Sequence, residues 1–210
     1  MDGMIDMDKA RELVADRSLW PRVRDFLWDF APQIHASWRE ELAIPANLDT
    51  PRIRRYVLDS LGVTPCFHDF PKADGSRLLL LDASTLDNIA KWLGALAGAD
   101  SLRLVTDGAT VRELKKSLPG VYPEVFGYTA YFKLPPRPGK TGDEVAANGY
   151  AMLFSALAGL PEPLHARLRL KLPRRICDSN GKQGDGPTPL ATVQKLLKLK
   201  FPEAYALCCC

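Results

Sequence analysis

The sequence has few of the residues that enzymes most often use for chemistry. Histidine occurs only three times in 210 residues, as His35, His68 and His165. Cys66, His68 and Asp69 could supply metal ligands, but no second cluster with the spacing of a metal site follows them. No serine lies in a Gly-x-Ser-x-Gly elbow, and no pair of carboxylates stands beside a glycine-rich turn. These absences predict a protein that is not an enzyme and that needs neither a cofactor nor a metal ion.

A phosphate-binding loop is also missing, although Gly139-Lys140-Thr141 resembles the end of one. The motif needs a glycine five residues before Gly139, where the chain turns so that its amides face phosphate. Leu134 stands there, and prolines at 135, 136 and 138 remove three amide donors. We therefore do not expect nucleotide binding.

The sequence contains no long hydrophobic run. The longest nearly apolar stretch, residues 151–160, is shorter than the roughly 20 residues that a helix needs to cross a bilayer. The N-terminus is acidic and lacks the apolar core of a secretory signal. We therefore expect a cytoplasmic protein, unless a partner holds it at a membrane.

The five cysteines do not form a disulfide framework, because their number is odd and three of them are adjacent at the C-terminus. This pattern favours a reducing compartment. Cys208, Cys209 and Cys210 could bind a soft metal or oxidise, but residues 203–210 are expected to be a frayed tail without function.

What the sequence does contain is an uneven distribution of charge. The net charge is only +3. Residues 1–160 hold 19 basic against 21 acidic residues, whereas residues 161–200 hold 9 against 3. A basic C-terminal quarter on a nearly neutral body suggests one acidic partner rather than general binding to polyanions.

Apolar residues recur at helical spacing along most of the chain. The clearest stripes lie in residues 23–30, 50–57, 84–97, 107–118, 143–158 and 190–201. Residues 135–142 and 178–189 are loops by composition. Residues 78–81 could be a short strand or a helix; residues 165–172 alternate like a strand, but the spacing of their leucines favours a helix. We predict a mainly α fold over residues 1–210, as a single compact multi-helix domain with at most one short strand or hairpin.

Two of these stripes also fit the first helix of a helix-turn-helix, at residues 85–94 and 110–118. A DNA reader needs a second helix soon afterwards that presents basic or amide side chains to the bases. Residues 121–127 carry one charge, which is acidic, and residues 95–99 carry none. Packing of two amphipathic helices explains both stretches better, and a nucleic-acid-binding regulator remains the alternative.

Four blocks, taken in order, resemble the SctK/YscK family, the accessory proteins of the sorting platform in type III secretion systems. The first block, residues 30–35, is similar to a Phe-x-Pro segment that ends in histidine, with Ile34 where the family often has tyrosine. The second, residues 86–114, is similar to a leucine-rich helix ending in Leu-Gly, a basic turn and a further helix. The third joins a small-residue helix, residues 149–160, to the ending Arg-Leu-x-Leu-x-Leu-Pro of residues 167–173. The fourth, residues 189–202, resembles the terminal helix.

The resemblance implies an adaptor without catalytic activity. Members of this family connect the cytosolic, forkhead-associated-like domain of the inner-membrane ring protein SctD to the pod protein SctQ, and through it indirectly to SctL and the ATPase SctN. The resemblance implies no nucleic acid partner and no insertion into the membrane.

We expect basic side chains to meet an acidic face of the ring protein. The candidate partner-binding residues are Lys91, Arg103, Arg112, Lys115 and Lys116 in the second block, and Arg167, Arg169, Arg174 and Arg175 in the basic quarter. Arg103 is the best single candidate, because Leu102 and Leu104 on either side of it should pin the backbone and its planar guanidinium suits carboxylates. Trp20, Trp28 and Trp38 are candidate anchors for the pod protein, although burial in the core is the more common fate of tryptophan.

Overall fold

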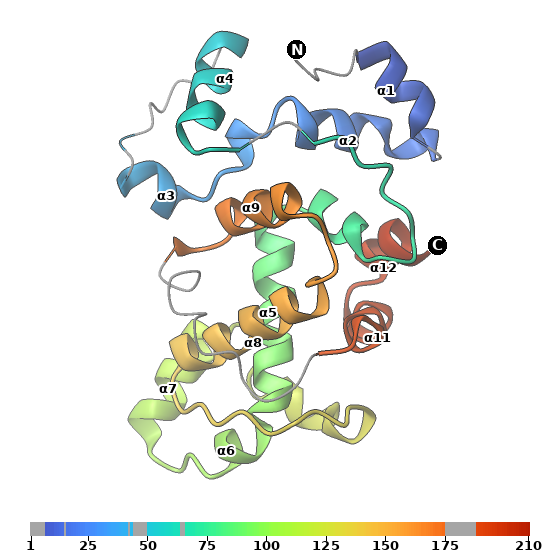
Figure 1. Ribbon diagram of the computed structural model, residues 1–210. Helices are drawn as coiled ribbons and strands as arrows, with labels where there is room; N and C mark the ends of the chain where they lie inside the picture. Colours follow the sequence, from blue (N-terminus) through green and yellow to red (C-terminus); the bar gives the residue numbers. More distant parts are fainter. Residues whose placement is uncertain (1–6, 15, 42, 44–49, 64–65, 175–187) are drawn as a thin grey trace. The chain divides into compact units, whose positions relative to one another are not determined.

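The computed structural model describes residues 7–14, 16–41, 43, 50–63, 66–174 and 188–210. These residues are mainly helical and contain no strand, which confirms the predicted mainly α fold (Figure 1). The chain divides into two compact units, each made of segments that are distant in the sequence. Unit 1 comprises Met1–Ala83, Gly159–Cys177 and Leu207–Cys210, and unit 2 comprises Ser84–Ala158 and Asp178–Ala206. That residues 1–210 form one domain stays a prediction.

Unit 1 combines N-terminal helices with one helix from late in the chain. Its helices are α1 (Met7–Leu13), α2 (Trp20–Leu27), α3 (Ala36–Glu41), α4 (Pro51–Ser60) and α9 (Glu162–Lys171), with 3-10 turns η1 (Arg17–Leu19), η2 (Ala31–Gln33) and η3 (Ser76–Leu80). Phe26 of α2 lies at the centre of the core, because its ring meets those of Phe30 and Phe70 edge to face at centroid distances of 5.4 and 5.7 Å. Such edge-to-face pairs stabilise a core beyond the area they bury.

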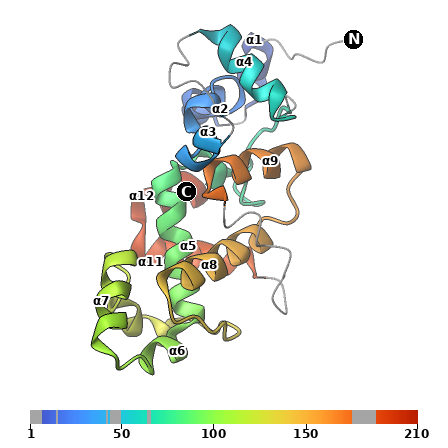
Figure 2. The ribbon, with the colours of Figure 1, turned by 90° about the vertical axis from the view of Figure 1, so that its left-hand side faces the viewer.

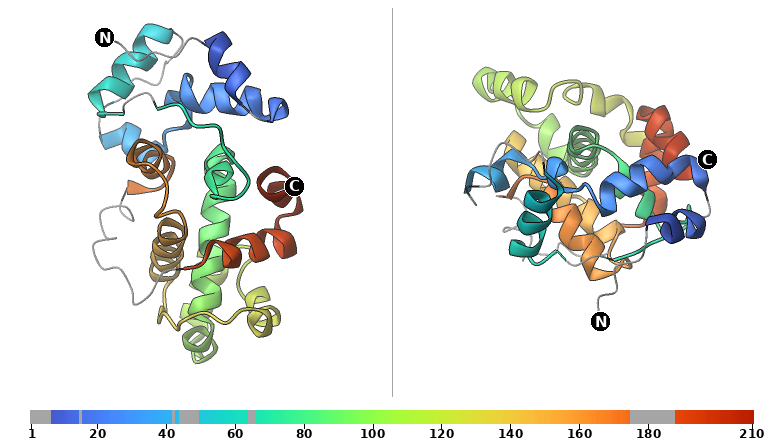
Figure 3. Two further views of the ribbon diagram at one scale, coloured as in Figure 1. Left: turned by 45° about the vertical axis from the view of Figure 1, so that its right-hand side comes forward. Right: turned by 90° about the horizontal axis from the view of Figure 1, so that it is seen from above.

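Unit 2 is organised around the long helix α5 (Ala83–Ala97), whose residues 92–97 are all buried. Its other helices are α6 (Ala99–Arg103), α7 (Gly108–Ser117), α8 (Gly142–Ala156), α11 (Leu190–Lys200) and the first part of α12 (Pro202–Cys209), with 3-10 turns η4 (Glu124–Gly127) and η5 (Thr129–Tyr131). The left view of Figure 3 shows α5 beside α8 and α11. The start of α7 is capped by Asp107, whose carboxylate accepts a hydrogen bond from the Thr110 amide at 2.7 Å.

The backbones of α5 and α8 touch where Gly94 meets Gly149. A Cβ atom on Gly94 would lie 1.9 Å from the Val145 carbonyl oxygen, and one on Gly149 would lie 1.7 Å from that of Ala90. Only glycine leaves room for two helix backbones to approach this closely. The glycine pair therefore fixes how the two main helices of unit 2 cross.

The structure settles the two ambiguous segments. Residues 76–80 form the 3-10 turn η3, which follows Gly75 at a φ of 78° that favours glycine. Residues 162–171 form α9, in agreement with the helix favoured from leucine spacing. The alternation of basic and apolar residues in α9 does not separate exposed from buried positions, because Arg167 and Lys171 are buried together with Leu168.

The prediction of a frayed C-terminal tail is wrong. Residues 202–209 form the helix α12, which begins at Pro202 and buries Ala204 and Cys208. Burial raises the pKa of the Cys208 thiol to about 12, so this cysteine is a core residue and not a reactive thiolate. Of the two predicted loops, residues 135–141 are indeed non-helical, whereas most of residues 178–189 lie outside the described part of the chain.

Candidate functional site

Arg167, a predicted partner-binding residue, lies inside unit 1. Its side chain is 1% exposed and donates hydrogen bonds to the carbonyl oxygens of Phe26 and Leu27, the latter at 3.1 Å. These carbonyls belong to the last two residues of α2, where a helix has acceptors without partners and a partial negative charge. The prediction that Arg167 binds a partner is therefore wrong for the folded chain, because its guanidinium is buried and donates its hydrogen bonds to the end of α2.

Lys171, one turn further along α9, is buried in the same way. Its ammonium donates to the carbonyl oxygens of Leu79 at 2.7 Å and Leu81 at 2.6 Å, at the end of η3. Burial lowers the pKa of Lys171 to about 7. Both cations lie over the ring of Phe26, whose centroid is 5.4 Å from the Arg167 guanidinium and 5.5 Å from the Lys171 ammonium.

A third buried cation, Arg77, completes this set. Its guanidinium donates to the carbonyl oxygens of Phe70 at 2.9 Å and Leu207 at 3.3 Å, and it lies 3.3 Å from the Asp16 carboxylate. Arg77, Arg167 and Lys171 thus hold the segments of unit 1 together through main-chain carbonyls. Nothing in the sequence distinguished these cations from solvated ones, because their acceptors lie up to 141 positions away.

Trp38 also forms hydrogen bonds within unit 1. Its indole N–H donates to the carbonyl oxygens of Leu172 at 2.9 Å and Arg169 at 3.1 Å. The guanidinium of Arg174 lies 4.9 Å from the Trp38 ring centroid, so this cation stacks on the indole. Trp20 and Trp28 are half-buried, and their ring centroids lie 5.8 Å apart. Their role as anchors for the pod protein stays a prediction.

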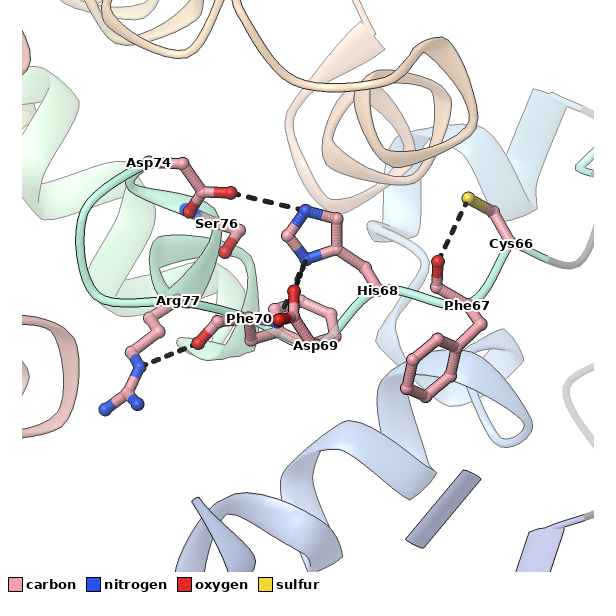
Figure 4. Close-up of polar contacts among 8 residues, drawn as sticks. All are labelled: Cys66, Phe67, His68, Asp69, Phe70, Asp74, Ser76 and Arg77. Carbon is pink, nitrogen blue, oxygen red and sulfur yellow. Dashed lines mark hydrogen bonds and ion pairs between the residues drawn. The ribbon is translucent and has the colours of Figure 1, made fainter. Parts of the chain in front are cut away.

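The candidate metal ligands Cys66, His68 and Asp69 lie in the loop drawn in Figure 4. The Nε2 atom of His68 lies 3.2 Å from the Asp74 carboxylate, and its Nδ1 atom accepts a hydrogen bond from the Phe70 amide at 3.0 Å. The Cys66 thiol donates to the Phe67 carbonyl oxygen. Both ring nitrogens are thus used by the loop itself. Across the described ranges, no three His, Cys, Asp or Glu side chains converge as a metal site requires.

Two backbone amides of the segment Gly139-Lys140-Thr141, which resembles the end of a phosphate-binding loop, donate hydrogen bonds to a carboxylate of the chain. Glu144 accepts hydrogen bonds from the amides of Lys140 at 2.7 Å and Thr141 at 3.2 Å, and these bonds lower its pKa. Thr141 accepts in turn from the Glu144 amide, which completes a capping box at the start of α8. The segment begins a helix and offers these two amides to no phosphate.

Arg103 is half-exposed at the end of α6 and is held by its neighbours in unit 2. It donates to the Thr129 hydroxyl at 2.9 Å, lies 3.5 Å from the Asp100 carboxylate and stacks on Phe126. Leu102 is buried, but Leu104 is 80% exposed, so the expectation that leucines on both sides pin the backbone is wrong for Leu104.

The remaining predicted partner-binding cations differ in their exposure and in whether they form an ion pair. Lys91 pairs with Asp87 at 2.7 Å, and Arg169 is exposed and pairs with Glu162 at 3.1 Å. Arg112, Lys115 and Lys116 are all exposed on α7. Arg175 lies outside the described residues.

Two lysines of the basic quarter fasten α11 inside unit 2. Lys200 lies 4.5 Å from the Trp92 ring centroid and 3.0 Å from the Glu124 carboxylate, and Lys195 donates to the Tyr131 carbonyl oxygen at 2.6 Å. With Arg167 and Lys171 buried in unit 1, much of the positive charge of residues 161–200 is used internally. These four side chains are therefore held within the units, and an acidic partner for the rest of the basic quarter stays a prediction.

The alternative of a helix-turn-helix lacks its second helix. The segment after α7 forms the short 3-10 turn η4, whose carboxylate, Glu124, is bound by Lys200. The helix after α5 is α6, which has only five residues. Neither can lie along a major groove as a recognition helix does.

Comparison of the chain with family models, with curated proteins and with solved structures finds no match. Among the described residues, no helix is both long and apolar enough to cross a membrane.

Proposed function

We propose that this chain is a non-catalytic adaptor of a type III secretion sorting platform, of the SctK/YscK family. In this role it links the cytosolic domain of the SctD-type ring protein to the SctQ-type pod protein, beneath the inner membrane. The observation that carries the proposal is that the four sequence blocks which resemble this family pack against one another in the fold.

In unit 1 the first block meets the end of the third. The His35 amide donates to the Leu170 carbonyl oxygen at 2.8 Å. The guanidinium of Arg167, the first residue of the Arg-Leu-x-Leu-x-Leu-Pro ending, lies 5.5 Å from the ring centroid of Phe30, the first residue of the Phe-x-Pro segment. Two short patterns more than 130 residues apart thus form one contact.

In unit 2 the second block meets the start of the third. Gly94, which ends the leucine-rich helix, lies against Gly149, which begins the small-residue helix. The fourth block joins them, because Lys200 of α11 lies over Trp92 of α5. Chance matches would have no reason to occupy mutually dependent positions, so this coincidence supports a shared fold.

The same geometry explains why none of these blocks carries chemistry. Their distinctive residues are glycines at a helix crossing, a buried arginine at a helix end and aromatic rings in a core. A protein whose shared residues build a rigid body acts through its surface, as an adaptor does.

Co-purification tests this proposal directly. The full chain, tagged and purified, should capture the cytosolic domain of the ring protein and, separately, the pod protein from the same secretion system. It should not shift duplex DNA, and it should not hydrolyse ATP. Failure to capture either protein, or binding to duplex DNA with the steep salt dependence of phosphate contacts, would contradict the adaptor function.

A further inference from the structure

The outward face of α7 carries three cations close together. Arg112, Lys115 and Lys116 are spaced i, i+3 and i+4, which places them as neighbours on one side of the helix. All three are exposed, while Leu114 and Leu118 on the opposite side are fully buried. Figure 2 shows α7 at the edge of unit 2.

These three cations have no carboxylate partner in the part of the chain that the structure describes. The two acidic residues nearest in sequence are directed elsewhere. Asp107 caps the helix through the Thr110 amide, and the Glu113 carboxylate lies toward the first residue of α8, 3.5 Å from where a Cβ on Gly142 would be. By contrast, Lys91 and Arg103 in the same unit each pair with a carboxylate.

Such an arrangement costs stability. Like charges at these spacings destabilise a helix. The helix dipole offsets part of this cost for Lys115 and Lys116, which lie in the last turn, but not for Arg112 in the middle of the helix. A single-sign cluster without internal compensation attracts an acidic surface.

The exposed side chain of Leu104 favours a protein over a nucleic acid as the partner that binds this surface. Leu104 lies in the connection that leads from α6 into α7 and is 80% exposed, beside the half-exposed Arg103. An exposed leucine contributes nothing to phosphate contacts, whereas it adds buried apolar area in a protein interface.

We propose that the outward face of α7, together with Leu104, is the surface on which the chain docks an acidic, apolar-containing face of the ring protein's cytosolic domain. This inference rests on the proposed function and names the surface that would perform it. The contribution of the three cations should act mainly through the association rate, since exposed charges steer encounter more than they hold a complex.

The test compares full-length variants for binding to the purified cytosolic domain of the ring protein. Arg112→Gln, Lys115→Gln and Lys116→Gln, combined, should lower the affinity roughly tenfold at low ionic strength and flatten its salt dependence. Leu104→Ser alone should lower the affinity at low and at high salt alike, because an apolar contact is not screened. Binding to the pod protein should be unchanged in both variants.

A matched control removes three exposed charges from unit 1, through Arg11→Gln, Arg17→Gln and Lys72→Gln. It should bind the ring protein as the unmodified chain does, and circular dichroism should show native helix content in every variant. Equal affinity of the α7 variant and this control would overturn the inference while leaving the adaptor function intact, as would loss of pod binding alone. Loss of duplex DNA binding in the α7 variant would reassign the face to nucleic acid. If the unmodified chain binds neither the ring protein nor the pod protein, that result contradicts both the adaptor function and this docking surface.

Discussion

At the scale of single residues, the cations of α9 show how position alone changes the role of a side chain. Arg167 and Lys171 are buried on the same helix as the exposed Arg169. The two buried cations donate to carbonyl oxygens, which keeps their charge near partial negative charges without bringing a carboxylate into the core. Removing one partner from such a group leaves the other unsatisfied, so these residues are sensitive positions for stability.

The burial of Lys171 predicts a pH dependence of stability. Burial lowers its pKa to about 7 from the ordinary value of 10.5, so between these values the unfolded chain binds a proton that the folded chain does not. The free energy of unfolding of unit 1 should therefore rise with pH above 7, by up to about 1.4 kcal/mol per pH unit, and should not change from this group below pH 7.

Lys171→Met should abolish this rise, which urea unfolding followed by tryptophan fluorescence can measure between about pH 7 and pH 8.5, below the titration of ordinary thiols. The exposed Lys198 supplies the control, because Lys198→Met should keep the slope of the unmodified chain. If Lys171→Met retained the full slope, the lysine would not be the titrating group.

At the scale of elements, the crossing of α5 and α8 leaves no room for a side chain at either of its glycines. Alanine at Gly94 or Gly149 would place a methyl group within 2 Å of a carbonyl oxygen on the other helix. Alanine favours a helix over glycine by about 1 kcal/mol. That gain is smaller than the cost of forcing the helices apart, so each substitution should destabilise the chain by about 2–3 kcal/mol or more.

Thermal or urea unfolding measures this loss. Gly127→Ala is the matched control, because a Cβ there meets nothing within 4 Å and the residue is not in the left-handed region. Stability of Gly94→Ala equal to that of the control would show that the two helices can separate without cost.

At the scale of the whole molecule, neither unit is encoded by one continuous segment. Unit 1 needs α9, which provides the acceptor for the His35 amide, one of the two acceptors for the Trp38 indole, and the cation that caps α2. A fragment of residues 1–83 should therefore lack native helix content by circular dichroism and unfold without a cooperative transition.

Co-expression of residues 1–83 with residues 159–210 should restore part of the helix content, because the second fragment contains α9 and α12. A fragment of residues 1–83 that unfolded cooperatively by itself would show that α9 is not needed for this unit.

The sequence by itself determined the helical class and many of the helix positions. Apolar spacing located α2, α5, α7, α8 and α11. Local signals suffice here because helix periodicity and capping depend on residues within about four positions of each other. The same locality explains why the absence of a phosphate loop could be predicted from residues 134–141 alone.

Only the tertiary structure decided which cations are available at the surface. Arg167 and Arg112 are both basic residues within helical stretches of the sequence, yet Arg167 is buried against a helix end 140 residues away and Arg112 is exposed. It also turned the cysteine-rich tail into the helix α12, which the burial of Ala204 and Cys208 stabilises. The physical reason is the same in both cases: burial depends on partners brought together by folding, and their distance along the chain leaves no local pattern.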